Sequence, residues 1–277
     1  MSDGFDPTRF KAMERAGFNR IARHYDEGAH LRESLQAALV DAAAPAAGEC
    51  WLDVASGPGL LARAMAPRLA PGGWVLATDI AEGMLAHARG RTDAPNIYWT
   101  AADAEHLCLP DGRFDGVSIG LGLFVFPHPE RALAELRRSL RPGGRIALSV
   151  WGAPGSVPLI ERAQQCLARL LPPPRVLRPS VFRFGEPEVL AAALSGAGFS
   201  SLRLTPHEFS CHFANADAYW DAFLALAGGV AEALVRLPEG RQAALRAAVV
   251  EDLADFATAD GYRIPARTLI ATAVRGD

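Results

Sequence analysis

The sequence has little lysine, no closely spaced cysteines and no long apolar run. Lys11 is the only lysine among its 28 lysine and arginine residues. The four cysteines include no CxxC pair, so we expect reduced thiols, with no structural zinc site and no disulfide framework. The longest stretch free of Asp, Glu, Lys and Arg, at 146–160, has 15 residues. A helix that spans a bilayer needs roughly 18–20 apolar residues, so we expect no membrane span.

A surplus of basic residues is also absent. The formal net charge is −3, whereas a protein dedicated to nucleic acid or to an anionic membrane surface needs a concentrated basic face. No basic segment followed by an apolar stretch opens the chain, so we expect no secretory signal. The sequence therefore predicts a cytoplasmic protein whose partner is neither a nucleic acid nor a membrane.

Short apolar runs alternate with helical stretches between residues 50 and 151, which is typical of a parallel sheet built from βαβ units. Prolines then punctuate short helices, before a β-like run at 201–213, a helical stretch broken at Gly228 and Gly229, and a final strand at 262–274. These patterns divide the chain into an N-terminal helical segment (1–48), a core (49–151), a cap segment (152–198) and two last strands (199–277) around a helical insertion at about 214–260.

A glycine loop at 52–59 follows the first predicted strand and precedes a predicted helix at 60–69. Such a loop lets a backbone approach a nucleotide-like ligand, because no Cβ obstructs it. Gly57, Gly59 and Ala62 satisfy G-x-G-x-x-A, and Asp79 lies 22 residues beyond Gly57. An NAD-dependent oxidoreductase is therefore one alternative.

Three other features of this region favour a different ligand. Asp53 places a carboxylate beside the loop, which suits a cationic ammonium better than a pyrophosphate. Pro58 removes an N–H that an anion would use. Asp103 follows the third predicted strand and can accept a hydrogen bond from an adenine amine.

Several motifs in a fixed order extend this pattern. On these motifs the chain resembles the class I S-adenosylmethionine-dependent methyltransferases, in the group that includes ubiquinone/menaquinone-biosynthesis C-methyltransferases and many natural-product methyltransferases. The motifs are FNRIA at 18–22, YD at 25–26, LDVASGPG at 52–59, ATDI at 77–80, ML at 84–85, DAE at 103–105, LP at 109–110, FD at 114–115 and LRPGG at 140–144.

The resemblance implies a Rossmann-like, seven-stranded, mostly parallel α/β sheet, with an N-terminal helical gate and a helical cap inserted among the last strands. It implies S-adenosyl-L-methionine as cofactor and a small-molecule methyl acceptor, whereas the oligomeric state stays open. Ala55 departs from the family pattern, which more often has glycine there. The resemblance also implies the residues that bind the cofactor. The methionine half would be held by Asp53, Ala55, Gly57 and Gly59, and its ammonium by the Gly120 carbonyl. Asp79 would bind the ribose hydroxyls, the adenine would be contacted by Ile80, Met84, Asp103 and Ala104, and Tyr25 would close the site.

Methyl transfer from a sulfonium needs alignment and exclusion of water, and a base only where the acceptor loses a proton. His128 follows the fourth predicted strand and is our candidate base, although it equally suits the start of a helix. We find no converging set of metal ligands, so no metal is predicted. A reaction other than methylation on the same cofactor remains a second alternative, and O-, N-, C- and S-methylation all stay open.

Aromatic residues gather in the predicted cap and at strand ends. An aromatic-rich lid suits a small apolar or aromatic acceptor, although large apolar side chains equally serve as core. These residues are Phe124, Phe126, Trp151, Phe182, Phe184, Phe209, Phe213, Tyr219, Trp220 and Phe223.

Overall fold

The computed structural model describes residues 5–172, 176–227, 234 and 237–276. The strands are β1 (Cys50–Val54), β2 (Trp74–Asp79), β3 (Ile97–Ala101), β4 (Phe114–Gly120), β5 (Leu140–Trp151), β6 (Phe199–Phe213), β7 (Ala257–Thr258) and β8 (Gly261–Arg275). The α-helices are α1 (Pro7–Glu27), α2 (Glu33–Ala43), α3 (Leu60–Leu69), α4 (Glu82–Arg89), α5 (Pro129–Ser139), α6 (Pro158–Leu170), α7 (Pro187–Gly196), α8 (Ala216–Leu226) and α10 (Glu239–Asp252), and the 3₁₀ helices are η1 (Gly28–Arg32), η2 (Leu123–Val125) and η3 (Ala254–Phe256).

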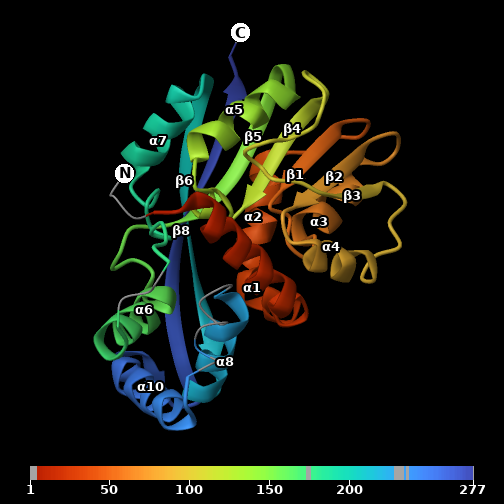
Figure 1. The fold of residues 1–277 in the computed structure, drawn as a ribbon. Coiled ribbons are helices and arrows are strands. Elements are labelled where there is room, and N and C mark those ends of the chain that lie inside the picture. Colours follow the sequence, from red (N-terminus) through yellow and green to blue (C-terminus); the bar gives the residue numbers. More distant parts are fainter. Residues whose placement is uncertain (1–4, 173–175, 228–233, 235–236, 277) are drawn as a thin grey trace.

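One mixed sheet organises the chain, in the order β3-β2-β1-β4-β5-β8-β6, with β7 paired to β8 (Figure 1). Strands β1 to β5 pair in parallel. Strand β8 runs antiparallel to both β5 and β6. The predicted mostly parallel, Rossmann-like α/β fold is thereby confirmed, and the two-residue β7 makes the eighth strand.

Successive side chains of β1 point to opposite faces of the sheet, as a pleated strand requires. Trp51 packs in a buried cluster with residues of α2 and α3, whereas Leu52 and Val54 belong to the cluster that holds α5 and α7. A Cβ on Gly116 of β4 would lie 2.4 Å from the Trp51 ring. Glycine at this position therefore makes room for the tryptophan, and helices cover both faces of the sheet.

The N-terminal helix α1 lies over the ends of the parallel strands. Its start is capped by the Asp6 carboxylate, which accepts a hydrogen bond of 3.0 Å from the Arg9 backbone N–H, and Pro7 occupies the first helical position, where no N–H is needed. Ile21 of α1 packs with Met84 of α4. In Figure 1, α1 lies between the sheet and the helices α6, α8 and α10, so it closes the space beside the strand ends.

Strands β6 and β8 continue as a long ladder beyond the rest of the sheet (Figure 1). Helices α8 and α10 are inserted between these strands, which confirms the predicted helical insertion, and they pack with α6 into a group that we call the cap lobe. The predicted cap segment (152–198) contributes to two different parts of the structure. Helix α6 packs in the cap lobe, whereas α7 lies along β6. The predicted helix break at Gly228 and Gly229 lies outside the described residues.

Within the described ranges, the structure has no helix that combines the length and the apolar character needed to cross a membrane.

Candidate active site

A cavity of about 400 Å³ opens where the parallel strands end. The loops after β1, β2, β3 and β4 form one part of its wall, α1 forms another, and the cap lobe with the segment before α7 forms the rest. Ligands of open α/β sheets bind at this carboxyl edge of the strands. Nine of the predicted cofactor-binding residues line the cavity, namely Tyr25, Ala55, Gly57, Asp79, Ile80, Met84, Asp103, Ala104 and Gly120.

The glycine loop has a left-handed backbone at three positions, with φ of 52° at Ala55, 55° at Gly57 and 76° at Gly59. Glycine adopts such angles freely, whereas a residue with a Cβ pays about 1–2 kcal/mol. Ala55 is therefore a strained position, and this explains why glycine suits it better. Gly59 does not line the cavity; a Cβ there would lie 2.2 Å from the Trp99 ring, so Gly59 packs the loop against β3.

Asp79, the last residue of β2, holds the glycine loop in place. Its Oδ2 accepts a 2.8 Å hydrogen bond from the Gly57 backbone N–H, and its Oδ1 accepts one of 2.8 Å from Ala81. Burial raises the pKa of this carboxyl, and the backbone donors oppose that shift. Each carboxylate oxygen has a second lone pair, so Asp79 can still accept hydrogen bonds from a ligand hydroxyl.

A second, smaller cavity of about 50 Å³ adjoins the glycine loop and shares Tyr25, Arg32 and Gly57 with the large one. Asp53 lines this smaller cavity and not the large one. Its Oδ1 accepts a 2.7 Å hydrogen bond from Ser118. Its Oδ2 is buried and makes no hydrogen bond within the described residues. Complete burial raises the pKa of Asp53 to about 7.

Arg32 of η1 was not predicted as a site residue, yet it lines both cavities. Only 5% of its surface is exposed. Its Nη1 donates a 2.6 Å hydrogen bond to the Tyr25 hydroxyl, and its Nε has no acceptor in the described part of the chain. Burial of a guanidinium without a carboxylate partner is unfavourable, so Arg32 could hold an anionic group of a ligand. Nothing in the local sequence marks Arg32, because its burial arises from the packing of η1 beside the loop.

Lys11, the single lysine, joins α1 to the loop after β3. Its Nζ lies 2.7 Å from Asp103 Oδ2 and 2.7 Å from Glu105 Oε2. Burial by itself would raise the pKa of Asp103, but the hydrogen bond and positive charge of Lys11 lower it below the ordinary value. The α1 helix and the predicted adenine-binding loop are thereby held together by a part-buried ion-pair network.

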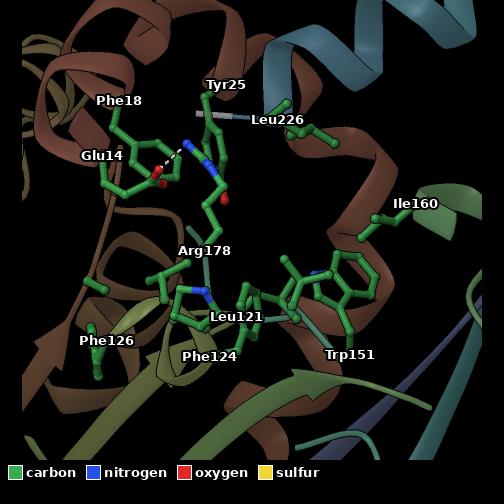
Figure 2. Close-up of a pocket in the computed structure, with 18 of the residues that line it drawn as sticks. Glu14, Phe18, Tyr25, Leu121, Phe124, Phe126, Trp151, Ile160, Arg178 and Leu226 are labelled. Carbon is green, nitrogen blue, oxygen red and sulfur yellow. Dashed lines mark hydrogen bonds and ion pairs between the residues drawn. The ribbon is translucent and has the colours of Figure 1, made fainter. Parts of the chain in front are cut away.

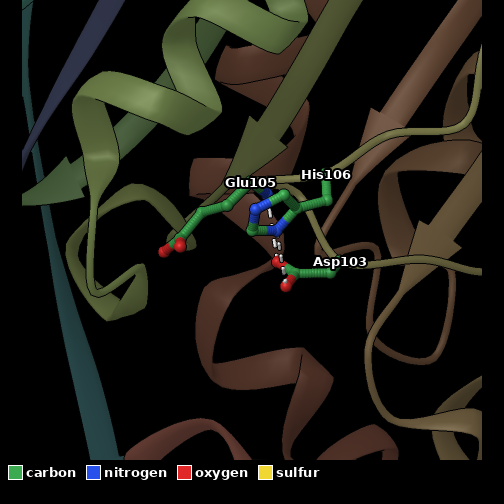
Figure 3. Close-up of side chains that lie close together, drawn as sticks. All are labelled: Asp103, Glu105 and His106. Carbon is green, nitrogen blue, oxygen red and sulfur yellow. Dashed lines mark hydrogen bonds and ion pairs between the residues drawn. The ribbon is translucent and has the colours of Figure 1, made fainter. Parts of the chain in front are cut away.

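Asp103, Glu105 and His106 also place one potential metal-ligand atom each within 4.8 Å of one another (Figure 3). His106 Nδ1 lies 3.3 Å from Asp103 Oδ2. The Lys11 ammonium already provides positive charge beside both carboxylates, so we assign no metal to this cluster.

His128, the predicted base, is not among the residues that line either cavity. It precedes α5 as the N-cap residue, and its backbone N–H donates a 2.8 Å hydrogen bond to Glu105. Its ring Nδ1 lies 3.5 Å from the Glu130 carboxylate. The geometry thus matches the helix-start alternative, and a catalytic role of His128 stays a prediction.

Six of the ten predicted aromatic residues line the large cavity, whereas the other four do not. Phe182, Phe184, Phe209 and Trp220 belong to the packing around it. The six that line it are Phe124, Phe126, Trp151, Phe213, Tyr219 and Phe223.

Another ion pair, Glu14 with Arg178, lines the apolar part of the cavity (Figure 2). Glu14 Oε1 lies 2.5 Å from Arg178 Nη2. Burial raises the pKa of Glu14, and Arg178 opposes that shift. The two residues are 164 positions apart in the chain, so only the folded structure brings them together.

The fold and the cavity are those of the α/β proteins that bind a nucleotide-like ligand at the carboxyl ends of their strands. Residues 52–148 match the family described as "Methyltransferase domain". A demethylmenaquinone methyltransferase of Thermus thermophilus is 38% identical over 205 residues, which cover 66% of this chain and 91% of that protein. A ubiquinone/menaquinone biosynthesis C-methyltransferase of Bordetella parapertussis is 43% identical over 136 residues, 47% of this chain and 53% of that protein.

Solved structures show the same fold at lower identity. A methyltransferase-like protein of Bacillus halodurans has a TM-score of 0.60 at 21% identity and covers 88% of this chain and 100% of its own. A phosphoethanolamine N-methyltransferase of Haemonchus contortus, in complex with S-adenosylhomocysteine, has a TM-score of 0.56 at 18% identity. The match covers 88% of this chain and 53% of that protein.

The chain belongs to the class I S-adenosylmethionine-dependent methyltransferases, in the group of the ubiquinone/menaquinone-biosynthesis enzymes. It is a methyltransferase enzyme, and neither the NAD-dependent nor the non-methylating alternative is favoured.

Proposed function

We propose that this enzyme methylates a small aromatic acceptor of the reduced-quinone class in the large cavity. The observation that carries the proposal is that one cavity joins the predicted cofactor loops to an apolar chamber. The relatives named demethylmenaquinone methyltransferase support a quinone-type ring as the acceptor.

The chemistry of the smaller cavity fits the methionine end of S-adenosylmethionine. A buried carboxylate (Asp53) and a buried guanidinium (Arg32) line it together, and they complement the ammonium and the carboxylate of an α-amino acid. Each has an atom without a hydrogen bond among the described residues. We therefore assign Asp53 and Arg32 to the amino-acid group, and Tyr25 to the orientation of Arg32.

The other cofactor contacts follow from the lining of the large cavity. We assign Asp79 to the ribose, because it ends β2 beside Gly57 and keeps free lone pairs. Met84 and Ile80 offer apolar contact to the adenine, and Asp103 offers an acceptor for its amino group. S-Adenosylmethionine supplies, when bound, the methyl group of its sulfonium. Ala55, Ala104 and Gly120 complete this part of the wall.

The acceptor part of the cavity is mainly apolar. Phe124 belongs to η2, Phe126 follows it and Trp151 ends β5. Helices α6 and α8 contribute Ile160 and Leu226 (Figure 2). Flat aromatic rings bind well between such walls, because binding removes the apolar surfaces of both the ring and the walls from contact with water. The walls also exclude water from the acceptor, and a positioned acceptor needs little more than alignment for an in-line displacement.

The test is a methyl-transfer assay with S-adenosylmethionine and reduced 1,4-naphthoquinone, read by mass spectrometry. We expect a product heavier by one CH₂ group. Gly57→Arg should abolish it, because the new side chain would enter the glycine loop at a left-handed position. Gly143→Arg is the matched control, since Gly143 also has a positive φ but a Cβ there meets nothing within 4 Å. Absence of any methylated product from a panel of reduced quinones would contradict the proposed acceptor class.

A further inference from the structure

The Glu14–Arg178 ion pair stands apart from the contacts assigned to the cofactor. Glu14 is on α1, one turn beyond Lys11, and Arg178 belongs to the segment between α6 and α7. In Figure 2 the pair lies on the same side of the cavity as Phe18 and Tyr25, whereas Trp151 and Ile160 lie on the other side. The pair therefore provides polar groups in a region whose other walls are mainly apolar rings and alkyl groups.

The carboxylate of Glu14 is only partly used. Its Oε1 contacts Arg178 at 2.5 Å, whereas Oε2 makes no hydrogen bond that involves the described residues. The side chain is 10% exposed. Glu14 lines the cavity, and Oε2 is not among the fully buried atoms without a partner. Its lone pairs are therefore free to accept an O–H or N–H from a ligand in the cavity.

Arg178 offers the complementary half of the contact. A single carboxylate, that of Glu14, pairs with it within the described ranges, and its side chain is 24% exposed. Its guanidinium carbon lies 5.9 Å from the centroid of the Phe10 ring, which helps to hold it at the cavity wall. A guanidinium has five N–H donors, so donors remain for an oxygen of a ligand. Together the two side chains can accept from a hydroxyl and donate to the same oxygen.

We propose that Glu14 and Arg178 bind a ring hydroxyl of the methyl acceptor and thereby select hydroxylated aromatic rings over purely apolar or O-alkylated rings. Glu14 Oε2 accepts the hydroxyl hydrogen, and an N–H of Arg178 donates to the hydroxyl oxygen. This inference deepens the proposed function and rests on it, because it names the groups that fix the acceptor in the apolar chamber.

The test compares two ligands that differ only at the oxygen, 1-naphthol and 1-methoxynaphthalene. Both are titrated into the protein saturated with S-adenosylhomocysteine. Only 1-naphthol can donate to Glu14, whereas both can accept from Arg178. A hydrogen bond to a charged group corresponds to a preference of about tenfold or more. We expect the unaltered protein to prefer 1-naphthol by that factor.

The variants separate the two halves of the contact. Glu14→Gln keeps the shape but removes the charge, and should reduce the preference to about threefold, as expected for a neutral hydrogen bond. Arg178→Met should weaken both ligands. The double variant Glu14→Met/Arg178→Met should bind both ligands within about twofold of each other. Glu27→Gln is the matched control, because Glu27 lies on the same helix and is 54% exposed; it should keep the full preference.

Equal binding of the two ligands by the unaltered protein would overturn the inference, as would an undiminished preference in the double variant. Affinity for S-adenosylhomocysteine is measured on every variant and should not change, which reports that the fold and the cofactor site are intact. If the unaltered protein fails to bind S-adenosylhomocysteine at all, the proposed function fails. If it binds the cofactor product but does not distinguish the two naphthalenes, only the assignment of Glu14 and Arg178 fails.

Discussion

Asp53 and Arg32 line the same small cavity beside the glycine loop, and each has one buried polar atom, Oδ2 and Nε, that makes no hydrogen bond within the described residues. A buried charge normally binds an opposite charge, either in the protein or in a ligand. This arrangement underlies the proposal that Asp53 and Arg32 bind the two charged groups of an amino acid.

Arg32→Met should weaken S-adenosylhomocysteine binding by about 1.5–3 kcal/mol, because a charge-assisted hydrogen bond to the ligand carboxylate is lost. Methylthioadenosine, which has no amino-acid group, should bind to the variant as it does to the unaltered protein. Calorimetric titration of both ligands measures the difference. Arg23→Met is the control, since Arg23 is 79% exposed. An equal loss for both ligands would contradict the assignment of Arg32 to the carboxylate.

The pKa of about 7 for Asp53 predicts pH-dependent cofactor binding. Only the ionised carboxylate attracts the ligand ammonium, so affinity for S-adenosylhomocysteine should increase, by roughly tenfold at most, between about pH 6 and about pH 7.5. Binding below the pKa should release a proton, which titration in two buffers of different ionisation enthalpy detects. Asp53→Asn should bind weakly and without this pH dependence. A pH dependence retained in Asp53→Asn would assign the effect to another group.

Lys11→Met should lower the free energy of unfolding by about 1–3 kcal/mol near pH 7, because Asp103 and the buried Glu105 lose their shared cation. Since the pKa of Asp103 is lowered in the fold, its contribution is present above the ordinary carboxyl pKa and is lost as the pH falls through the lowered value. The difference between variant and unaltered protein should therefore be complete near pH 7 and shrink at about pH 3, below the ordinary carboxyl pKa. Urea unfolding at both pH values measures it, with Lys11→Arg as the charge-preserving control. A difference that stays constant with pH would show that the ion pairs contribute nothing.

Gly59→Ala and Gly48→Ala separate backbone strain from steric clash. Both positions have a positive φ, 76° and 84°, so both variants should lose about 1 kcal/mol of stability. A Cβ at Gly59 would also lie 2.2 Å from the Trp99 ring, whereas one at Gly48 meets nothing within 4 Å. Gly59→Ala should therefore cost about 1–3 kcal/mol more. Equal unfolding free energies would mean that Trp99 moves aside freely.

The sequence predicted the elements whose residues are neighbours in the chain. The first strand, the glycine loop and α3 have a local pattern of apolar run, glycines and amphipathic helix, so their positions follow from spacing alone. The carboxylates Asp53, Asp79 and Asp103 were predicted for the same reason, since each lies near the end of a strand or just after it, and the carboxyl ends of these strands lie at one edge of the sheet.

The residues that the sequence did not indicate are those placed by distant contacts. Lys11 lies 92 positions from Asp103, and Glu14 lies 164 from Arg178. No periodicity reports which loop α1 will meet, and the burial of Arg32 depends on the loop packed beside it. For His128 the local pattern predicted a place in the site, because the residue follows a strand. The chain turns into α5 at this point, however, and the His128 ring lies beside Glu130.

Calorimetric titration of the protein with S-adenosylmethionine, S-adenosylhomocysteine and NAD⁺, side by side, directly tests which cofactor the site binds. We expect micromolar binding of both adenosyl ligands and no binding of NAD⁺. Tight binding of NAD⁺ without either adenosyl ligand would contradict it, and would make Asp79 the ribose ligand of a dinucleotide.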